Sequence, residues 1–162
     1  MVSVELNLER LKVIRAANVQ SQADNSPEDA LEKILEFAKS NNLKDKSGAR
    51  LFGRNFYHSD QSEPHGYEYY LTIEEGVKPS REMVVRDIPE GLYVTLRVRG
   101  VAEISRGWNI LFSMVESAGY TPVGVCRQVY GWVTAGFEEI VNWQQQVNPK
   151  DWIIDLWLQL KE

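Results

Sequence analysis

A seven-residue pattern occurs twice in this chain, and the repeat constrains the fold more than any other feature of the sequence. Residues 67–73 (YEYYLTI) align without a gap with residues 154–160 (IDLWLQL). Each copy has an acid at its second position, a large aromatic two residues later and an uncharged polar residue two residues after that. Because an internal repeat dictates architecture, we predict one domain over the whole chain, built from two similar halves of about 1–78 and 79–162.

The composition supports a single domain and excludes several classes of protein. The chain has 162 residues, of which 43% are hydrophobic and 25% charged, so it can bury a substantial core. Its net charge of -5 argues against direct binding to nucleic acid, which needs clustered Lys and Arg. The sequence has neither a signal-like start nor a long apolar stretch, so we expect a soluble, cytoplasmic protein without a membrane segment. Cys126 is the only cysteine, which excludes an intramolecular disulfide and a multi-cysteine zinc site.

Hydrophobic periodicity predicts the order strand, helix, strand, strand in the first half. Residues 2–19 alternate and then turn rich in β-forming side chains, which indicates a bent or broken first strand. Ser26 and Pro27 are typical of a helix start, as N-cap and first helical residue. Strands are then expected over 50–57 and 66–73.

The second half is predicted to repeat this order. A strand over 83–88, a turn at Pro89–Gly91 and a strand over 92–99 open it. Apolar residues from Ile104 to Val115 recur at helical spacing, and Gly119 follows as a helix C-cap.

The last part of the chain is predicted to hold two closing strands, over 123–130 and 152–160. Between them, Phe137, Ile140 and Val141 suggest a short amphipathic helix. The fold class is therefore α+β: two β-α-β-β modules form an antiparallel sheet layer with the helices packed on one side.

Strand periodicity turns the repeat into a prediction about faces. The odd-numbered residues of 67–73 and the even-numbered residues of 154–160 should face the helices. Glu68 and Tyr70, with Asp155 and Trp157, should share the other face. Aromatic walls with a few polar groups suit a pocket for a flat organic molecule, and a carboxylate beside them would favour a cation. The alternative is ordinary cross-strand packing with solvated acids.

Other candidate sites carry weaker signals. His58 and His65 lie in a polar loop without a recognised metal-ligand spacing, so we expect no metal. No nucleophile elbow and no Gly-rich phosphate loop occurs, and Cys126 has no neighbouring sequence signal for activation, so a buried inert thiol is expected. We also expect no cofactor.

Several short motifs, in their order and spacing, resemble the GyrI-like small-molecule-binding proteins. That group includes the effector-binding domains of multidrug-sensing bacterial transcription activators. The resemblance covers nearly the whole chain. It rests on RLFGRN (50–55), GYEYY (66–70), GLY (91–93), Trp108, ESAGY (116–120) and DLWL (155–158).

The resemblance implies two modules related by a pseudo-twofold, with a ligand cavity where they meet. Members of the family tend to bind hydrophobic, often cationic, aromatic compounds; some inhibit DNA gyrase, and a subset resembles hydrolases that open the cyclopropane ring of alkylating natural products. The positions that look like pocket positions in relatives are Glu68, Tyr70, Tyr93, Trp108 and Trp157.

Two departures from the family pattern matter. Many relatives carry an acid on the penultimate strand, where this chain has Cys126-Arg127-Gln128, so Gln128 is expected in place of the carboxylate and a preference for cations is in doubt. The chain also begins directly with the first strand, without a helix-turn-helix segment, so a stand-alone binding protein is expected.

Three functions remain open from the sequence. The favoured one is non-catalytic binding of an aromatic, amphipathic molecule, with Glu68 as the main anionic anchor. A hydrolase is the second, because a desolvated Glu68 could act as acid or base beside Tyr70 or Tyr93. Contact with a separate transcription regulator or with gyrase is the third. In the favoured function the walls are Tyr70, Tyr93, Trp108 and Trp157, Gln128 supplies a hydrogen bond, and Asp155 assists or faces solvent.

Overall fold

The computed structural model describes residues 6–22, 27–56, 66–123, 126–128, 131–133 and 136–162. An eight-stranded antiparallel sheet forms its centre, in the order β1-β6-β10-β9-β3-β4-β2-β5. The strands are β1 (Asn7–Leu11), β2 (Ile14–Gln22), β3 (Leu51–Phe56), β4 (Gly66–Thr72), β5 (Val84–Ile88), β6 (Gly91–Arg99), β9 (Phe137–Ile140) and β10 (Ile153–Gln159). The helices are α1 (Pro27–Ser40), α2 (Ile104–Ser117) and the short 3-10 turns η1 (Val101–Glu103), η2 (Trp143–Gln145) and η3 (Pro149–Asp151).

Local sequence explains where both long helices begin and end. In α1, Pro27 takes the first position, acids follow in the first turn and Lys39 lies in the last turn, which suits the helix dipole. The predicted N-cap, Ser26, lies outside the described residues. After α2, Gly119 adopts φ 82°, and the N–H groups of Gly119 and Tyr120 donate to the carbonyls of Glu116 and Val115. This Schellman arrangement confirms the predicted C-cap.

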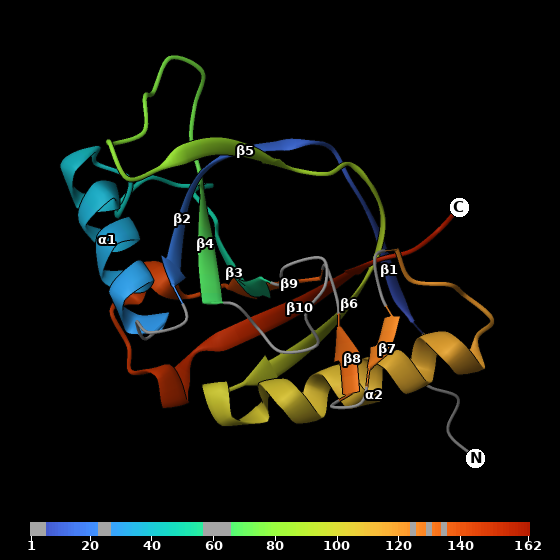
Figure 1. The fold of residues 1–162 in the computed structure, drawn as a ribbon. Coiled ribbons are helices and arrows are strands. Elements are labelled where there is room, and N and C mark those ends of the chain that lie inside the picture. Colours follow the sequence, from blue (N-terminus) through green and yellow to red (C-terminus); the bar gives the residue numbers. More distant parts are fainter. Residues whose placement is uncertain (1–5, 23–26, 57–65, 124–125, 129–130, 134–135) are drawn as a thin grey trace.

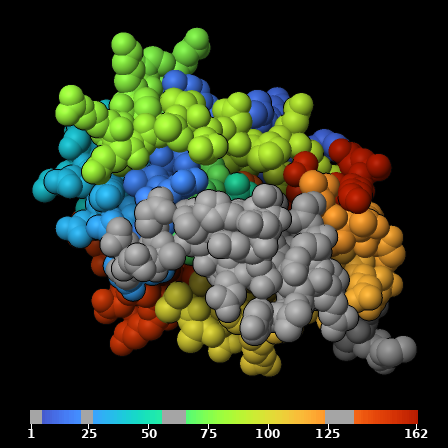
Figure 2. Space-filling model, in the orientation of Figure 1, coloured from blue at the N-terminus to red at the C-terminus, as the bar shows by residue number. Residues whose placement is uncertain are grey.

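The sheet is strongly curled, because the bent segments β1–β2 and β5–β6 each run from one edge region of the sheet to the other (Figure 1). β1 and β2 follow each other directly in the chain, as do β5 and β6. β1 pairs with β6 and β2 pairs with β5, so the two bent strands run antiparallel along their length. Figure 2 shows β5 and the segment before it along the upper rim of the molecule, with α1 at the left.

The two faces of the sheet bury different side chains. On one face, Tyr69 and Leu71 of β4 pack with α1, and Ile154 and Leu156 of β10 pack with α2. The other face lies inside the curl, and we call it the concave face. It buries a third hydrophobic cluster. These residues include Phe52, Tyr70, Tyr93, Phe137 and Trp157. The predicted alternation of faces in β4 and β10 is thereby confirmed.

Two predictions about the last part of the chain are wrong. Within 123–130, the described strand β7 (Cys126–Gln128) pairs with β8 (Gly131–Val133) in a separate two-stranded sheet and does not join the main one. The expected helix at 137–141 is instead strand β9, which lies between β10 and β3. All four residues of β9 are buried, and each face of the strand carries one apolar and one acidic side chain. The sequence of β9 therefore lacks the apolar and polar alternation that marks a strand with one exposed face.

Each half of the chain thus has strands, a helix and two further strands of the main sheet, while the pseudo-twofold relation between the halves stays a prediction. Neither long helix in the described part has the length and apolarity needed to cross a membrane.

Candidate functional site

A cleft of about 400 Å³ opens on the helix-covered face of the sheet, where the first turns of α1 and α2 approach each other (Figure 1). It contains residues from both halves of the chain. Its walls are largely apolar and aromatic, and its lining includes Leu31 of α1, Ile104 of α2, Tyr67 and Tyr69 of β4, Glu138 and Ile140 of β9, and Trp152 and Ile154 beside them.

Glu138 places a carboxylate in this cleft. Its residue is only 7% exposed. Oε1 accepts a hydrogen bond from the Tyr67 hydroxyl at 2.6 Å, and Oε2 accepts one from Nε1 of Trp108 at 3.0 Å. Burial raises the pKa of Glu138, and the hydrogen bonds from Tyr67 and Trp108 oppose that rise only in part. Burial and the nearby charge of Glu138 also raise the pKa of Tyr67 well above its ordinary value.

Gly53 allows Tyr67 to reach Glu138. Gly53 on β3 pairs with Glu138 on β9 and with Tyr69 on β4. A Cβ atom at Gly53 would lie 2.6 Å from the hydroxyl oxygen of Tyr67 and 2.8 Å from its Cε1. The ring of Tyr67 therefore crosses directly over Gly53, and only the absence of a side chain there makes this path available.

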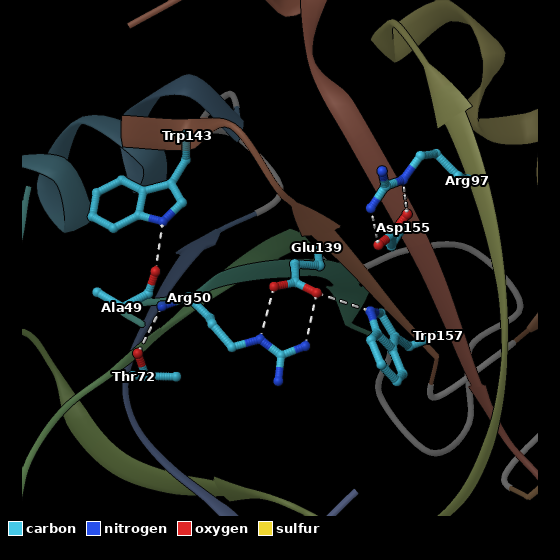
Figure 3. Close-up of polar contacts among 8 residues, drawn as sticks. All are labelled: Ala49, Arg50, Thr72, Arg97, Glu139, Trp143, Asp155 and Trp157. Carbon is cyan, nitrogen blue, oxygen red and sulfur yellow. Dashed lines mark hydrogen bonds and ion pairs between the residues drawn. The ribbon is translucent and has the colours of Figure 1, made fainter. Parts of the chain in front are cut away.

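The two other glutamates that are buried in the described part of the chain face the concave side, and each is paired with an arginine. Glu68 accepts from Nε of Arg54 at 2.9 Å and also from Gln20 and Tyr70. Glu139 accepts two bonds of 2.8 Å from Arg50 and one of 3.1 Å from the Trp157 indole (Figure 3).

Glu138 differs from both in its electrostatic environment. Among the described residues no Lys or Arg forms an ion pair with it, and its two donors are neutral. Of the three buried glutamates in the described part of the structure, Glu138 would therefore gain most from an incoming cation.

Most of the residues predicted from sequence lie away from this cleft. Glu68, Tyr70, Tyr93 and Trp157 are buried on the concave face. There Tyr70 packs edge-on against Phe137 with ring centroids 5.3 Å apart, and Tyr93 against Trp157 at 5.9 Å. The Tyr93 hydroxyl donates to a backbone carbonyl, and burial raises the pKa of Tyr93 to about 12. Their role in ligand binding stays a prediction.

The remaining three predicted residues have different surroundings. Trp108 on α2 contacts the cleft through its bond to Glu138. Asp155 lies on the concave face and binds Nε and Nη2 of Arg97 at 2.7 and 2.9 Å (Figure 3). Gln128 belongs to β7, and its side chain lies outside the described part of the structure.

Sequence reasoning missed Glu138, Tyr67 and Trp152. The strand that precedes β10 in the main sheet is β9, and the segment containing Gln128 belongs to a separate two-stranded sheet; Gln128 as a ligand-binding residue stays a prediction. β9 carries both Glu138 and Glu139. Because each face of β9 carries one apolar and one acidic side chain, the sequence offered no apolar and polar alternation that could have revealed this strand.

The described side chains contain no group of three or more His, Cys, Asp or Glu that could hold a metal ion. His58 and His65 lie outside the described residues.

Comparison with known proteins identifies the fold. A family model described as "GyrI-like small molecule binding domain" matches residues 8–161. The C-terminal domain of EcmrR superposes with a TM-score of 0.65 at 13% identity, over 98% of each chain. The chain spans 57% of the EcmrR chain that was solved in a complex with DNA, with a TM-score of 0.67 at 12% identity.

Two further solved structures share the fold. A hydrolase encoded by lin2189 from Listeria innocua has a TM-score of 0.62 at 12% identity, over 97% of this chain and 92% of that chain. SAV2435 bound to tetraphenylphosphonium has a TM-score of 0.54 at 12% identity, over 98% of this chain and 94% of that chain. A comparison with curated protein sequences found no match.

Proposed function

Because this chain belongs to the GyrI-like small-molecule-binding domain family, we propose that it binds an aromatic, amphipathic cation in the cleft between α1 and α2. One observation carries the proposal: Glu138 is a buried carboxylate in an apolar, aromatic-walled cleft, and its donors in the described structure are neutral. The cation would approach Glu138, while Tyr67 and Trp108 keep the carboxylate oriented.

The physical basis is the free energy of burying a charge. A carboxylate removed from water is destabilised unless an opposite charge or strong hydrogen bonds compensate it, and here the pKa of Glu138 remains raised despite two hydrogen bonds. A cationic ligand would supply the missing charge, and its aromatic groups would contact Tyr67, Tyr69 and Trp152. The cleft volume of about 400 Å³ suits a drug-sized molecule.

One structural relative supports this ligand class. SAV2435 was solved with tetraphenylphosphonium, which is a cation that carries four aromatic rings. At 12% identity the likeness concerns the fold, so the choice of ligand for this chain depends on Glu138 and the walls around it.

The test is a pair of calorimetric titrations with tetraphenylphosphonium and with the neutral analogue triphenylphosphine oxide. We expect Glu138→Gln to weaken binding of the cation at least tenfold and to leave the weak binding of the neutral analogue nearly unchanged, since it removes the charge and keeps the shape of the side chain. The amide oxygen can accept from Trp108, and the amide NH2 can donate to the Tyr67 hydroxyl once that hydroxyl rotates. The matched control is Glu28→Gln, which removes an exposed carboxylate at the rim of the same cleft.

Equal affinity of Glu138→Gln and the unaltered chain for the cation would refute Glu138 as the anchor. The sequence-predicted concave residues can be examined in the same assay through Tyr70→Phe and Trp157→Phe. If these two variants alone lost binding, the ligand would have to occupy the concave face instead.

A second candidate function is hydrolysis. The raised pKa of Glu138 and its bond to Tyr67 suit Glu138 to act as a general acid beside the cleft. Turnover of a cyclopropane-containing alkylating compound, lost in Glu138→Gln, would favour this function, whereas binding without any product would count against it. Signalling to a separate transcription regulator stays a proposal, and the comparisons give no support to a gyrase partner.

A further inference from the structure

Tyr69 carries a hydroxyl group that the described part of the fold leaves without a hydrogen-bond partner. The residue is only 4% exposed and lines the cleft beside Tyr67. Its backbone carbonyl accepts a bond of 3.1 Å from Asn18, but its side-chain oxygen forms no hydrogen bond with another described residue. The hydroxyls of Tyr67 and Tyr70 both have partners, so Tyr69 is the exception among the three tyrosines of β4.

This hydroxyl opens into the cleft. Every described side-chain nitrogen or oxygen atom that is fully shielded from solvent has a hydrogen-bond partner. The Tyr69 hydroxyl has none, so it is not shielded, and the space that it reaches is the cleft lined by this residue. The ring itself is covered, because it packs in the cluster beneath α1 and lies 5.0 Å from the Tyr67 ring, measured between centroids. A buried Tyr normally has a partner for its O–H, so this one indicates a partner from outside the fold.

The hydroxyl lies beside the anchoring carboxylate. Tyr67 and Tyr69 project from the same face of β4, two residues apart, which corresponds to about 7 Å along the strand. The Tyr67 hydroxyl is held by its 2.6 Å bond to Oε1 of Glu138. The Tyr69 hydroxyl is therefore offset from that carboxylate by about one side-chain spacing, about 7 Å. Burial, and after it the charge of Glu138, raise the pKa of Tyr69 well above its ordinary value, so the hydroxyl keeps its proton at neutral pH.

A neutral hydroxyl in this position needs an acceptor for its proton. Glu138 already accepts from Tyr67 and Trp108, and a cationic ligand would compensate its charge. The partner left for Tyr69 is an uncharged oxygen on the ligand, such as an ether or a carbonyl. A ligand without such an oxygen would displace water from the hydroxyl and leave a buried donor unpaired, which costs free energy.

We propose that Tyr69 selects, among aromatic cations, those that carry an uncharged oxygen acceptor about one phenyl ring away from the positive charge. The inference rests on the proposed function, because Glu138 holds the charge. The ring that joins the two groups lies against Tyr67, and the oxygen accepts from the Tyr69 O–H. Tyr69 is thus a specificity-determining residue, whereas Glu138 anchors every cation that enters the cleft.

The test compares triphenylphosphonium cations whose fourth ring carries either a methoxy or an ethyl group. Both substituents are placed at ring position 3 and at ring position 4, which gives four compounds. Methoxy and ethyl groups are similar in size, so each pair differs mainly in one ether oxygen. We expect calorimetry to show at least threefold tighter binding of the methoxy compound at one of the two positions. In Tyr69→Phe that ratio should fall to about one, and the matched control Tyr120→Phe, at an exposed hydroxyl, should keep it.

Stability in urea gives an independent check of the free hydroxyl. Tyr69→Phe should leave the midpoint of unfolding unchanged or raise it, because its hydroxyl has no bond within the described fold to lose. Tyr67→Phe should lower the midpoint, because it loses the bond to Glu138. An equal fall in both variants would show that the Tyr69 hydroxyl has a partner within the fold, and the inference would be wrong.

Glu138→Gln separates this inference from the proposed function. It should weaken all four compounds and leave the preference for methoxy in place. If methoxy and ethyl compounds bound equally at both ring positions while Glu138→Gln still weakened them all, only the role of Tyr69 would be refuted. If Glu138→Gln weakened none of them, the proposed function would fail instead.

Discussion

Gly53→Ala tests whether the path of Tyr67 over β3 is required for the geometry at Glu138. The new Cβ would lie 2.6 Å from the Tyr67 hydroxyl oxygen and 2.8 Å from Cε1, so the ring must move away. Overpacking of this kind costs about 1–3 kcal/mol, and a lost hydrogen bond to a carboxylate costs about 1.5–3 kcal/mol. Replacing Gly by Ala within a strand returns about 0.5–1 kcal/mol. The expected net loss is about 2–5 kcal/mol, measured as the free energy of unfolding in urea.

Making Gly53→Ala in a Tyr67→Leu protein distinguishes a clash with the Tyr67 ring from any other effect of alanine at position 53. In Tyr67→Leu the obstructing ring is absent, so Gly53→Ala should there be neutral or stabilising by up to about 1 kcal/mol. The change of sign between the two backgrounds is the decisive result. Equal destabilisation in both would show that the alanine clashes with something other than Tyr67, and a loss below about 0.5 kcal/mol in the unaltered background would show that the ring shifts freely.

Two further predictions concern the cleft and its support. Gly107→Ala on α2 would place a Cβ 2.7 Å from Cγ1 of Val98 and 2.9 Å from Cδ1 of Leu156. Overpacking of about 1–3 kcal/mol, offset by the roughly 0.5–1 kcal/mol that Ala gains over Gly in a helix, should leave about 0–2.5 kcal/mol of destabilisation in urea. The exposed Ser113→Ala on the same helix should be neutral or slightly stabilising. The pKa of Glu138 is raised, so the folded protein keeps the Glu138 carboxyl protonated at a higher pH than the unfolded chain does. The free energy of unfolding should therefore fall as the pH rises from the ordinary carboxyl range toward the raised pKa. Over the same pH interval the affinity for tetraphenylphosphonium, measured by calorimetry, should rise as Glu138 ionises. The prediction would be contradicted if the affinity of Glu138→Gln changed with pH in the same way as that of the unaltered chain.

Local signals were sufficient for the parts of the fold that depend on neighbouring residues. The start of α1 at Pro27 and the end of α2 before Gly119 follow from backbone preferences that act within one turn. The faces of β4 and β10 follow from strand alternation, since one side of each packs against a helix. These features could be predicted because the residues that decide them lie close together in the sequence.

The candidate site depends on contacts between distant residues, and for this reason it was not predicted. Glu68 was the expected anchor, but its register partner on β3 is Arg54, which neutralises it. That partnership becomes visible only when the strand pairing is known. β9 escaped recognition because Glu138 and Glu139 occupy opposite faces and both are buried, whereas alternation normally marks a strand with one wet face.

Under the proposed function, the positions of the described arginines decide which face of the sheet accepts a cation. Glu138 and Glu139 are consecutive residues with similar burial, yet Arg50 pairs with Glu139 alone. A second guanidinium on the helix side would satisfy Glu138 in the same way and would exclude a cationic ligand from the cleft. The fold instead gives Glu138 two neutral donors, which orient its carboxylate without cancelling its charge. Under the proposed function, ligand charge selectivity depends on the lack of a guanidinium beside Glu138 among the described side chains as much as on the presence of the acid.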